Sequence, residues 1–250
     1  MKILQSNPGN TSKELLSFRS GFIPSTFTGI CEIDNIITYC KDGEIHREDG
    51  PAIEYENGRK EWYLNGKLHR EDGPALIFAG GTKQWYIHNQ LHRDGSPAIE
   101  HVDGSYSWYK NGQLHREDGP ATEDAGGNKW WYLHGKKHRV DGPAIDRKDG
   151  YKAWYLNDVI HREDGPAIEY ADGSKHWIIN GLHHRIDGPA VEYANGSKEW
   201  RFNGKFHRTD GPALEYVGGD KMWYLDGMLH GVNNDFTTES WKYLQRTLIF

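Results

Sequence analysis

The sequence predicts an all-β fold: an elongated antiparallel β-hairpin solenoid of eight 23-residue repeats with a C-terminal capping helix. Three observations predict it. Asn-Gly and Asp-Gly pairs, which form tight turns, recur along the chain. Hydrophobic residues make up only 36% of the sequence, which is little for a large globular core. A histidine recurs every 23 residues without any insertion, at His46, His69, His92, His115, His138, His161, His184, His207 and His230.

Residues 1–38 precede the repeats and lack their period. We expect this segment to form a non-repeat N-terminal cap, with one short helical turn over residues 12–18 packed under Phe22 and Ile23. Such a cap protects the open end of a solenoid from edge pairing.

The repeat array spans residues 39–231, and its consensus is nearly complete in residues 46–68. The consensus is His-Arg-x-Asp-Gly-Pro-Ala-Ile-Glu-Tyr-x-(Asn/Asp/Gly)-Gly-x-Lys-x-Trp-Tyr-Leu-Asn-Gly-x-Leu. Two turn signals occur in each unit, one at positions such as Asn57-Gly58 and one at positions such as Asn65-Gly66. The two turns predict a continuous antiparallel meander with two strands per repeat.

The first turn signal predicts a two-residue type I′ hairpin, which fixes the register. With that turn at Asn57-Gly58, Ile53 lies opposite Trp62 and Ala52 lies opposite Tyr63. The same register sets Tyr55 against Lys60 and Glu54 against Glu61. Aliphatic and tryptophan columns are therefore expected on one apolar face, and tyrosine and glutamate columns on the other.

Residues 232–250 follow the last repeat and predict a capping helix. Thr237 is the expected N-cap, Glu239 favours the positive helix end, and Phe236 with Trp241 fits a hydrophobic staple. Trp241, Leu244 and Leu248 are expected to form its apolar face.

The element Asn65-Gly66-Lys67-Leu68-His69, followed by an aromatic-rich strand, resembles the MORN repeat. The resemblance covers residues 39–231 and is to a variant form, because the His-Gly-x-Gly of that family is replaced here by His-Arg-x-Asp-Gly-Pro-Ala. Similar variant arrays occur in giant viruses and bacteria. The resemblance implies a β-hairpin solenoid with a scaffolding, protein-binding or lipid-binding role.

Composition and charge exclude several classes of function. The net charge of −6 argues against a nucleic-acid-binding protein, and Cys31 and Cys40 alone provide no disulfide framework. No apolar run resembles a signal peptide or could cross a bilayer. We therefore expect a soluble intracellular protein, located in the host cytoplasm if it is viral.

The repeated His-Arg-x-Asp segment offers a base, a cation and a carboxylate in each loop. An active site requires one pocket with perturbed groups, whereas near-equivalent copies indicate a structural role, so we expect no enzyme and no catalytic residue. Neighbouring histidines are expected about 10 Å apart, which is too far to share one zinc ion. The sequence thus predicts no metal site and no cofactor.

Two columns of side chains remain as candidate binding sites. The leading hypothesis is a scaffold that binds another protein, of unknown identity, through a tyrosine face, with self-association as a further alternative. The runner-up is a site for an anionic small molecule or lipid head group on an arginine column. The tyrosine face comprises Tyr63, Tyr86, Tyr109, Tyr132, Tyr155 and Tyr224. The arginine column comprises Arg47, Arg70, Arg93, Arg116, Arg139, Arg162, Arg185 and Arg208.

Overall fold

The computed structural model describes residues 2–6, 25–33, 35–233 and 236–248. The chain divides into two compact units, Met1–Ala125 and Gly126–Phe250. Both units are built from short antiparallel strands, and the second ends in the helix α2 (Thr238–Leu248). The helical turn predicted over residues 12–18, together with Phe22 and Ile23, lies outside the described residues.

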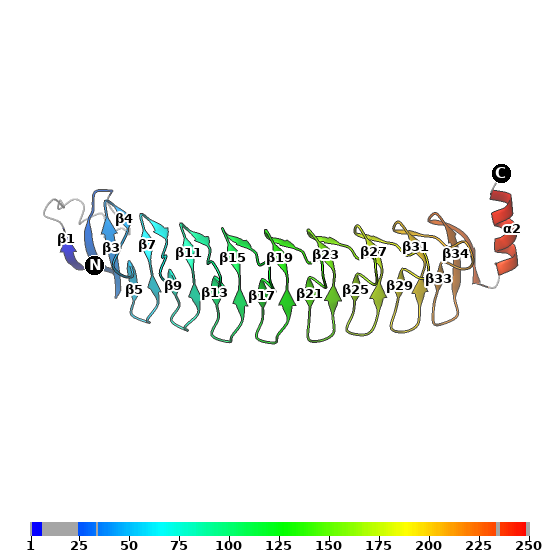
Figure 1. Cartoon of the computed structure of the whole chain (residues 1–250), viewed down its shortest axis with the longest axis horizontal. Helices are drawn as coiled ribbons and strands as arrows, with labels where there is room; N and C mark the ends of the chain where they lie inside the picture. Colours follow the sequence, from blue (N-terminus) through cyan, green and yellow to red (C-terminus); the bar gives the residue numbers. More distant parts are fainter. Residues whose placement is uncertain (1, 7–24, 34, 234–235, 249–250) are drawn as a thin grey trace. The chain divides into compact units, whose positions relative to one another are not determined.

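The first unit contains a main sheet whose strands follow one another in chain order (Figure 1). These strands are β1 (Lys2–Ser6), β2 (Gly29–Ile33), β3 (Ile36–Lys41), β5 (Ile53–Tyr55), β6 (Lys60–Glu61), β9 (Leu76–Ile77), β10 (Lys83–Gln84), β13 (Ile99–Glu100), β14 (Tyr106–Ser107) and β17 (Thr122–Glu123).

The second unit repeats this arrangement with its own main sheet. Its strands are β18 (Lys129–Trp130), β21 (Ile145–Asp146), β22 (Lys152–Ala153), β25 (Ile168–Glu169), β26 (Lys175–His176), β29 (Val191–Glu192), β30 (Lys198–Glu199), β33 (Leu214–Glu215), β34 (Lys221–Leu225) and β35 (Met228–Val232).

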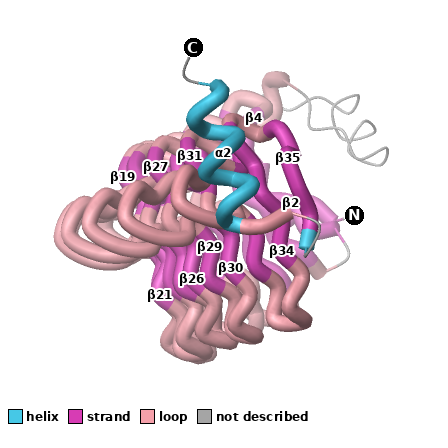
Figure 2. The backbone as a smooth tube through the Cα atoms, turned by 90° about the vertical axis from the view of Figure 1, so that its right-hand side faces the viewer, coloured by secondary structure: helices cyan, strands magenta, loops and turns pink. Residues whose placement is uncertain are grey.

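Seven of the eight repeats also carry a separate two-stranded hairpin beyond their tryptophan, whereas the last repeat continues into β34 and β35 of the main sheet. The chain is therefore a hairpin solenoid, as the sequence predicted, but not a simple meander with two strands per repeat. In the first unit, β4 (Glu44–Ile45) pairs with β3, and the hairpins are β7 (Tyr63–Leu64) with β8 (Lys67–Leu68), β11 (Tyr86–Ile87) with β12 (Gln90–Leu91), and β15 (Tyr109–Lys110) with β16 (Gln113–Leu114). In the second unit they are β19 (Tyr132–Leu133) with β20 (Lys136–Lys137), β23 (Tyr155–Leu156) with β24 (Val159–Ile160), β27 (Ile178–Ile179) with β28 (Leu182–His183), and β31 (Arg201–Phe202) with β32 (Lys205–Phe206). Figure 2 shows the hairpins β19, β27 and β31 apart from the main-sheet strands β21, β26 and β29.

The first turn differs from the predicted type I′ turn. The Gly58 amide donates to the Tyr55 carbonyl (3.0 Å), and the Tyr55 amide donates to the Arg59 carbonyl (3.0 Å). Gly58 has a φ of +88°, whereas Asn57 is not among the residues with positive φ. This geometry is a three-residue loop in which a type I turn is followed by one left-handed residue. The two-residue type I′ geometry occurs instead at the second turn, where Asn65 (φ 48°) and Gly66 (φ 70°) are both left-handed.

The longer loop shifts the register by one residue, so the predicted pairs are wrong. Ile53 lies opposite Glu61 and Glu54 lies opposite Lys60. Trp62 consequently does not share a face with Ile53, because successive side chains of a strand point to opposite sides. The aliphatic column is buried as expected at Ile53, Leu76, Ile145, Ile168, Val191 and Leu214.

The helix α2 closes the second unit (Figure 2), as the sequence predicted. Thr237 Oγ1 accepts the Ser240 amide (3.1 Å), which confirms the N-cap, and the Phe236 and Trp241 rings are 6.1 Å apart. Trp241 is fully buried, and its Nε1 donates to the Thr209 carbonyl (2.9 Å). The Leu248 side chain lies outside the described residues.

Candidate protein-binding site

The His-Arg-x-Asp-Gly-Pro segments form loops that lead from each hairpin back to the main sheet, and each arginine is held there by several partners. Arg162 Nε donates to Asp164 Oδ1 (2.8 Å), and Arg162 Nη1 donates to the Pro166 carbonyl (3.1 Å). Nη1 also lies 3.5 Å from Glu169 Oε1. The guanidinium carbon is 4.0 Å from the centroid of the Trp154 ring, which is a cation–π contact. This arginine is therefore a structural element of its own loop.

The remaining members of the predicted arginine column stack in the same way. The guanidinium carbon lies 3.8–4.3 Å from the ring centroid in every case. The pairs are Arg47 on Tyr39, Arg70 on Trp62, Arg93 on Trp85, Arg116 on Trp108, Arg139 on Trp131, Arg185 on Trp177 and Arg208 on Trp200. The arginine column predicted as an anion site is thus already occupied by aromatic rings and by carboxylates of the chain.

The carboxylates of these loops, in contrast, point into solvent. The Asp164 side chain is 83% exposed and that of Glu163 is 82% exposed, whereas Arg162 is only 22% exposed. The hydrogen bond from Arg162 holds the pKa of the Asp164 carboxyl below its usual range. The same holds for the pKa values of Asp49, Asp72, Asp118, Asp141, Asp187 and Asp210 beside their own arginines. We call this series of loops the acidic loop edge, residues 46–51 and their equivalents in the later repeats.

The repeated histidines hold the second turn of the next hairpin. His46 Nδ1 accepts the Asn65 backbone amide (3.1 Å), and His161 Nδ1 accepts the Asn180 amide (3.2 Å). Equivalent bonds join His92 to Asn111 and His184 to Asn203. Among the described residues, no group of three or more His, Cys, Asp and Glu side chains is placed to hold a metal ion.

The predicted tyrosine face lies over the aliphatic core. Tyr155, on the hairpin strand β23, packs against a buried cluster that includes Ile145, Ile168 and Ile178. Ile178, which stands where six of the other seven repeats have tyrosine, is 4% exposed. Burial raises the pKa of Tyr63 to about 12. All six tyrosines are half-buried, so much of their surface is used within the fold.

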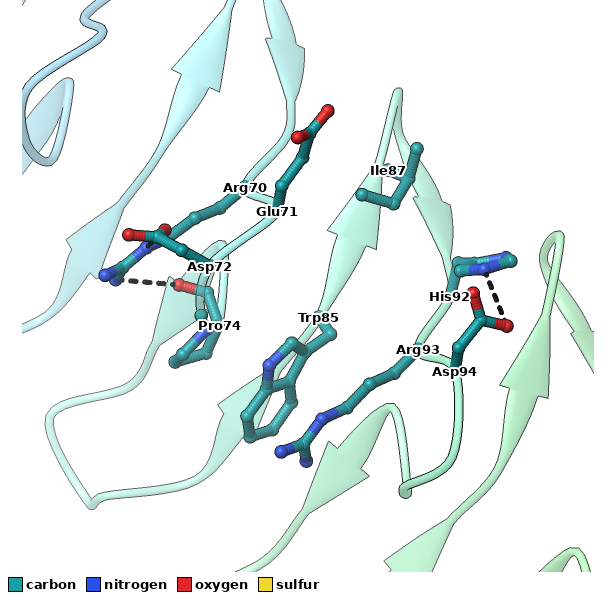
Figure 3. A pocket seen from close by; sticks show the side chains of 10 residues that line it. Arg70, Glu71, Asp72, Pro74, Trp85, Ile87, His92, Arg93 and Asp94 are labelled. Carbon is teal, nitrogen blue, oxygen red and sulfur yellow. Dashed lines mark hydrogen bonds and ion pairs between the residues drawn. The ribbon is translucent and has the colours of Figure 1, made fainter.

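Cavities between successive loops are a feature that the sequence did not predict. In the first unit, one cavity of about 660 Å³ separates the loop that contains Arg70 from the loop that contains Arg93 (Figure 3). Pro74, Trp85 and Ile87 supply its apolar surface. Pro74, Trp85 and Ile87 belong to one repeat, whereas His92, Arg93 and Asp94 on the other side of the cavity belong to the next, so the cavity forms only when the repeats stack.

A search of protein-family models finds no match to the chain, and a search of curated proteins finds none either. The resemblance to the MORN repeat stays a prediction from the sequence. No described helix is both long enough and apolar enough to pass through a membrane.

Proposed function

We propose that this chain is a non-catalytic scaffold that binds another protein along the acidic loop edge, through positively charged segments of that partner. The observation that carries the proposal is the unequal exposure of the loop charges. The arginine side chains that pair with a loop aspartate are 19–25% exposed, and their aspartate partners are 79–84% exposed. A partner approaching this edge meets carboxylates first.

The exposed charge and its repetition favour binding of a protein over catalysis of a reaction. The exposed glutamates Glu48, Glu71, Glu117 and Glu163 add to the aspartates, and their side chains are 73–84% exposed. Complementary charge raises association rates and selects partners even where each ion pair adds little affinity. A surface on which the same group recurs in successive repeats also gains from multivalent binding, which a single catalytic centre would not use.

Binding of an anion to the arginine column is the second candidate from the sequence. It requires each guanidinium to exchange a carboxylate of its own chain for a ligand, so we place it second. Both candidates predict salt-sensitive binding, and the sign of the ligand charge separates them.

The test measures fluorescence anisotropy of labelled oligolysine and labelled oligoglutamate with the full chain at low and physiological salt. We expect oligolysine to bind and to be released by salt, and oligoglutamate not to bind. Replacing Glu48 and Glu71 by Gln should weaken oligolysine binding several-fold, because both side chains are exposed and neither bonds an arginine.

A matched control removes two carboxylates elsewhere, by Asp220→Asn and Glu239→Gln, both of which are exposed. This control should leave binding unchanged. Equal weakening in both variants would reduce the interaction to general charge attraction and contradict the assignment to the loop edge. Binding of oligoglutamate in place of oligolysine would favour the arginine column.

A further inference from the structure

The cavities of the loop edge recur in successive repeats. In the second unit, three consecutive cavities of about 600, 500 and 570 Å³ lie between the loops that begin at Arg139, Arg162, Arg185 and Arg208. Among the described residues of the first unit, two consecutive cavities have volumes of about 730 and 660 Å³. Consecutive cavities share one loop, so a single extended ligand could contact them in order.

Each cavity combines an apolar surface with a carboxylate rim. The cavity between the Arg139 and Arg162 loops is lined by Pro143, Trp154 and Leu156, and its rim includes the exposed Asp141, Glu163 and Asp164. The arginines in the lining are bonded to their own carboxylates and stacked on tryptophan. Lys and Arg side chains match this combination, since their aliphatic stems pack on apolar surface while the charged ends remain near water and carboxylates.

The repeat fixes the spacing of the cavities. Two main-sheet strands per repeat, at 4.7–4.9 Å each, set successive loops about 9.6 Å apart. A polyproline II helix has three residues per turn and a rise of 3.1 Å per residue, so side chains three residues apart point to the same side at about 9.3 Å. Side chains on one face of an extended β-strand recur at about 6.7 Å, which does not match.

We propose that the cavities of the acidic loop edge bind a polypeptide segment in the polyproline II conformation with Lys or Arg at every third residue. One cationic side chain enters each cavity. The inference rests on the proposed function and specifies the chemistry and the register of the partner at that site.

The test uses three labelled proline-based peptides that each carry three arginines, placed at every second, every third or every fourth position. The proline host keeps all three in the same conformation, so they differ in the spacing and direction of the cations. With the full chain, we expect the every-third peptide to bind about tenfold more tightly than the other two, because only it fills consecutive cavities at once.

A variant pair locates the site. Ile186 is 85% exposed and lines two of the cavities in the second unit, so Ile186→Lys places a cation at both rims. Val217 is 70% exposed and lines none of the five cavities. We expect Ile186→Lys to weaken the every-third peptide by about fivefold or more and Val217→Lys to leave it unchanged.

The outcomes separate this inference from the proposed function. Equal affinity for all three spacings, or no effect of Ile186→Lys, would contradict the binding of one cationic side chain in each cavity. Salt-sensitive binding of the cationic peptides would in that case still support the acidic loop edge as the binding surface. Failure of every cationic peptide to bind would overturn both.

Discussion

At the scale of single residues, the loop motif is explained by the space that one arginine occupies. A Cβ atom added to Gly165 would lie 2.8 Å from Arg162 Cζ, closer than real Cβ contacts. Gly165 has no positive φ, so space and not backbone conformation requires glycine there. Ala167, two residues on, is fully buried. The Arg-x-Asp-Gly-Pro-Ala pattern is therefore explained by the packing of a guanidinium between its own loop and a tryptophan.

Gly165→Ala should accordingly destabilise the chain by about 1–3 kcal/mol, since the new methyl group displaces the arginine from its partners. The measurement is the free energy of unfolding in urea. Gly218→Ala is the control, because nothing lies within 4 Å of its added Cβ and its φ is not positive. In an Arg162→Ala background the cost of Gly165→Ala should largely vanish. An unchanged cost there would mean that the clash is not with the arginine.

The loop aspartates predict how stability depends on pH. Hydrogen bonding by arginine lowers the folded-state pKa of Asp164 and Asp187. A lowered pKa stabilises the folded state above the unfolded value of about 3.9 and loses this effect as the pH falls through the folded-state pKa. We expect the melting temperature to fall below about pH 4 and to fall less steeply in the variant Asp164→Asn, Asp187→Asn. An identical pH profile for this variant would contradict the role of the ion pairs.

At the scale of elements, the two turns of each repeat perform different tasks. The two-residue turn at Asn180-Gly181 has both residues left-handed and is held by His161 of the preceding loop. The three-residue turn of the main sheet has one left-handed residue, such as Gly196, and sets the register of the paired strands. The hairpin turn is thus held by His161 of its own repeat and by the Ile160 carbonyl of the preceding repeat, which accepts the Gly181 amide (2.9 Å), while local turn geometry sets the register of the main sheet.

A repeat whose first turn contains two adjacent glycines, Gly80 and Gly81, tests this turn assignment. Gly81 has a φ of +93°, whereas Gly80 does not have a positive φ and has open space around it. Gly81→Ala should cost about 1 kcal/mol of unfolding free energy, because alanine is strained in the left-handed region. Gly80→Ala should be neutral or stabilise by about 0.5 kcal/mol by restricting the unfolded chain. A two-residue type I′ turn would place both glycines in the left-handed region, so both substitutions would destabilise the chain. A destabilising Gly80→Ala would therefore support the two-residue turn and contradict the three-residue turn.

At the scale of the whole chain, stability comes from contacts between adjacent repeats, as in other repeat proteins. Each arginine of the column stacks on an aromatic ring of the preceding repeat, and main-sheet strands pair across the repeat boundaries, as β22 does with β25 and β26 with β29. The last repeat is not followed by another repeat, and α2 packs against it instead. The Phe236 ring lies 5.6 Å from the Trp223 ring, and Trp241 lies 5.7 Å from His230.

Trp241→Ala should therefore cost about 3–5 kcal/mol of unfolding free energy, as expected for a large buried aromatic side chain. Tyr243→Ala on the same helix is the matched control, since Tyr243 is 72% exposed, and it should leave stability nearly unchanged. Removal of residues 234–250 should lower the melting temperature and promote self-association, which sedimentation velocity would detect. A truncated chain that stayed monomeric and equally stable would show that α2 is not a cap.

The sequence by itself determined the features that depend on neighbouring residues. The histidine interval gave the repeat length, the Asn-Gly and Asp-Gly pairs located both turns, and Thr237 with Phe236 and Trp241 predicted the capped helix. Each of these signals depends on residues close together in the sequence, so it can be identified without knowledge of the tertiary structure. The buried aliphatic column was predicted for the same reason, because alternation along one strand identifies it.

The tertiary structure alone decided which face each column occupies and what the loop charges contact. Asn57-Gly58 is compatible with a two-residue or a three-residue turn, and a difference of one residue moves Trp62 to the opposite side from Ile53. The cavities, and the stacking of Arg162 on Trp154, form between residues of adjacent repeats. Sequence spacing specifies neither, because both depend on the register in which one repeat stacks on the next.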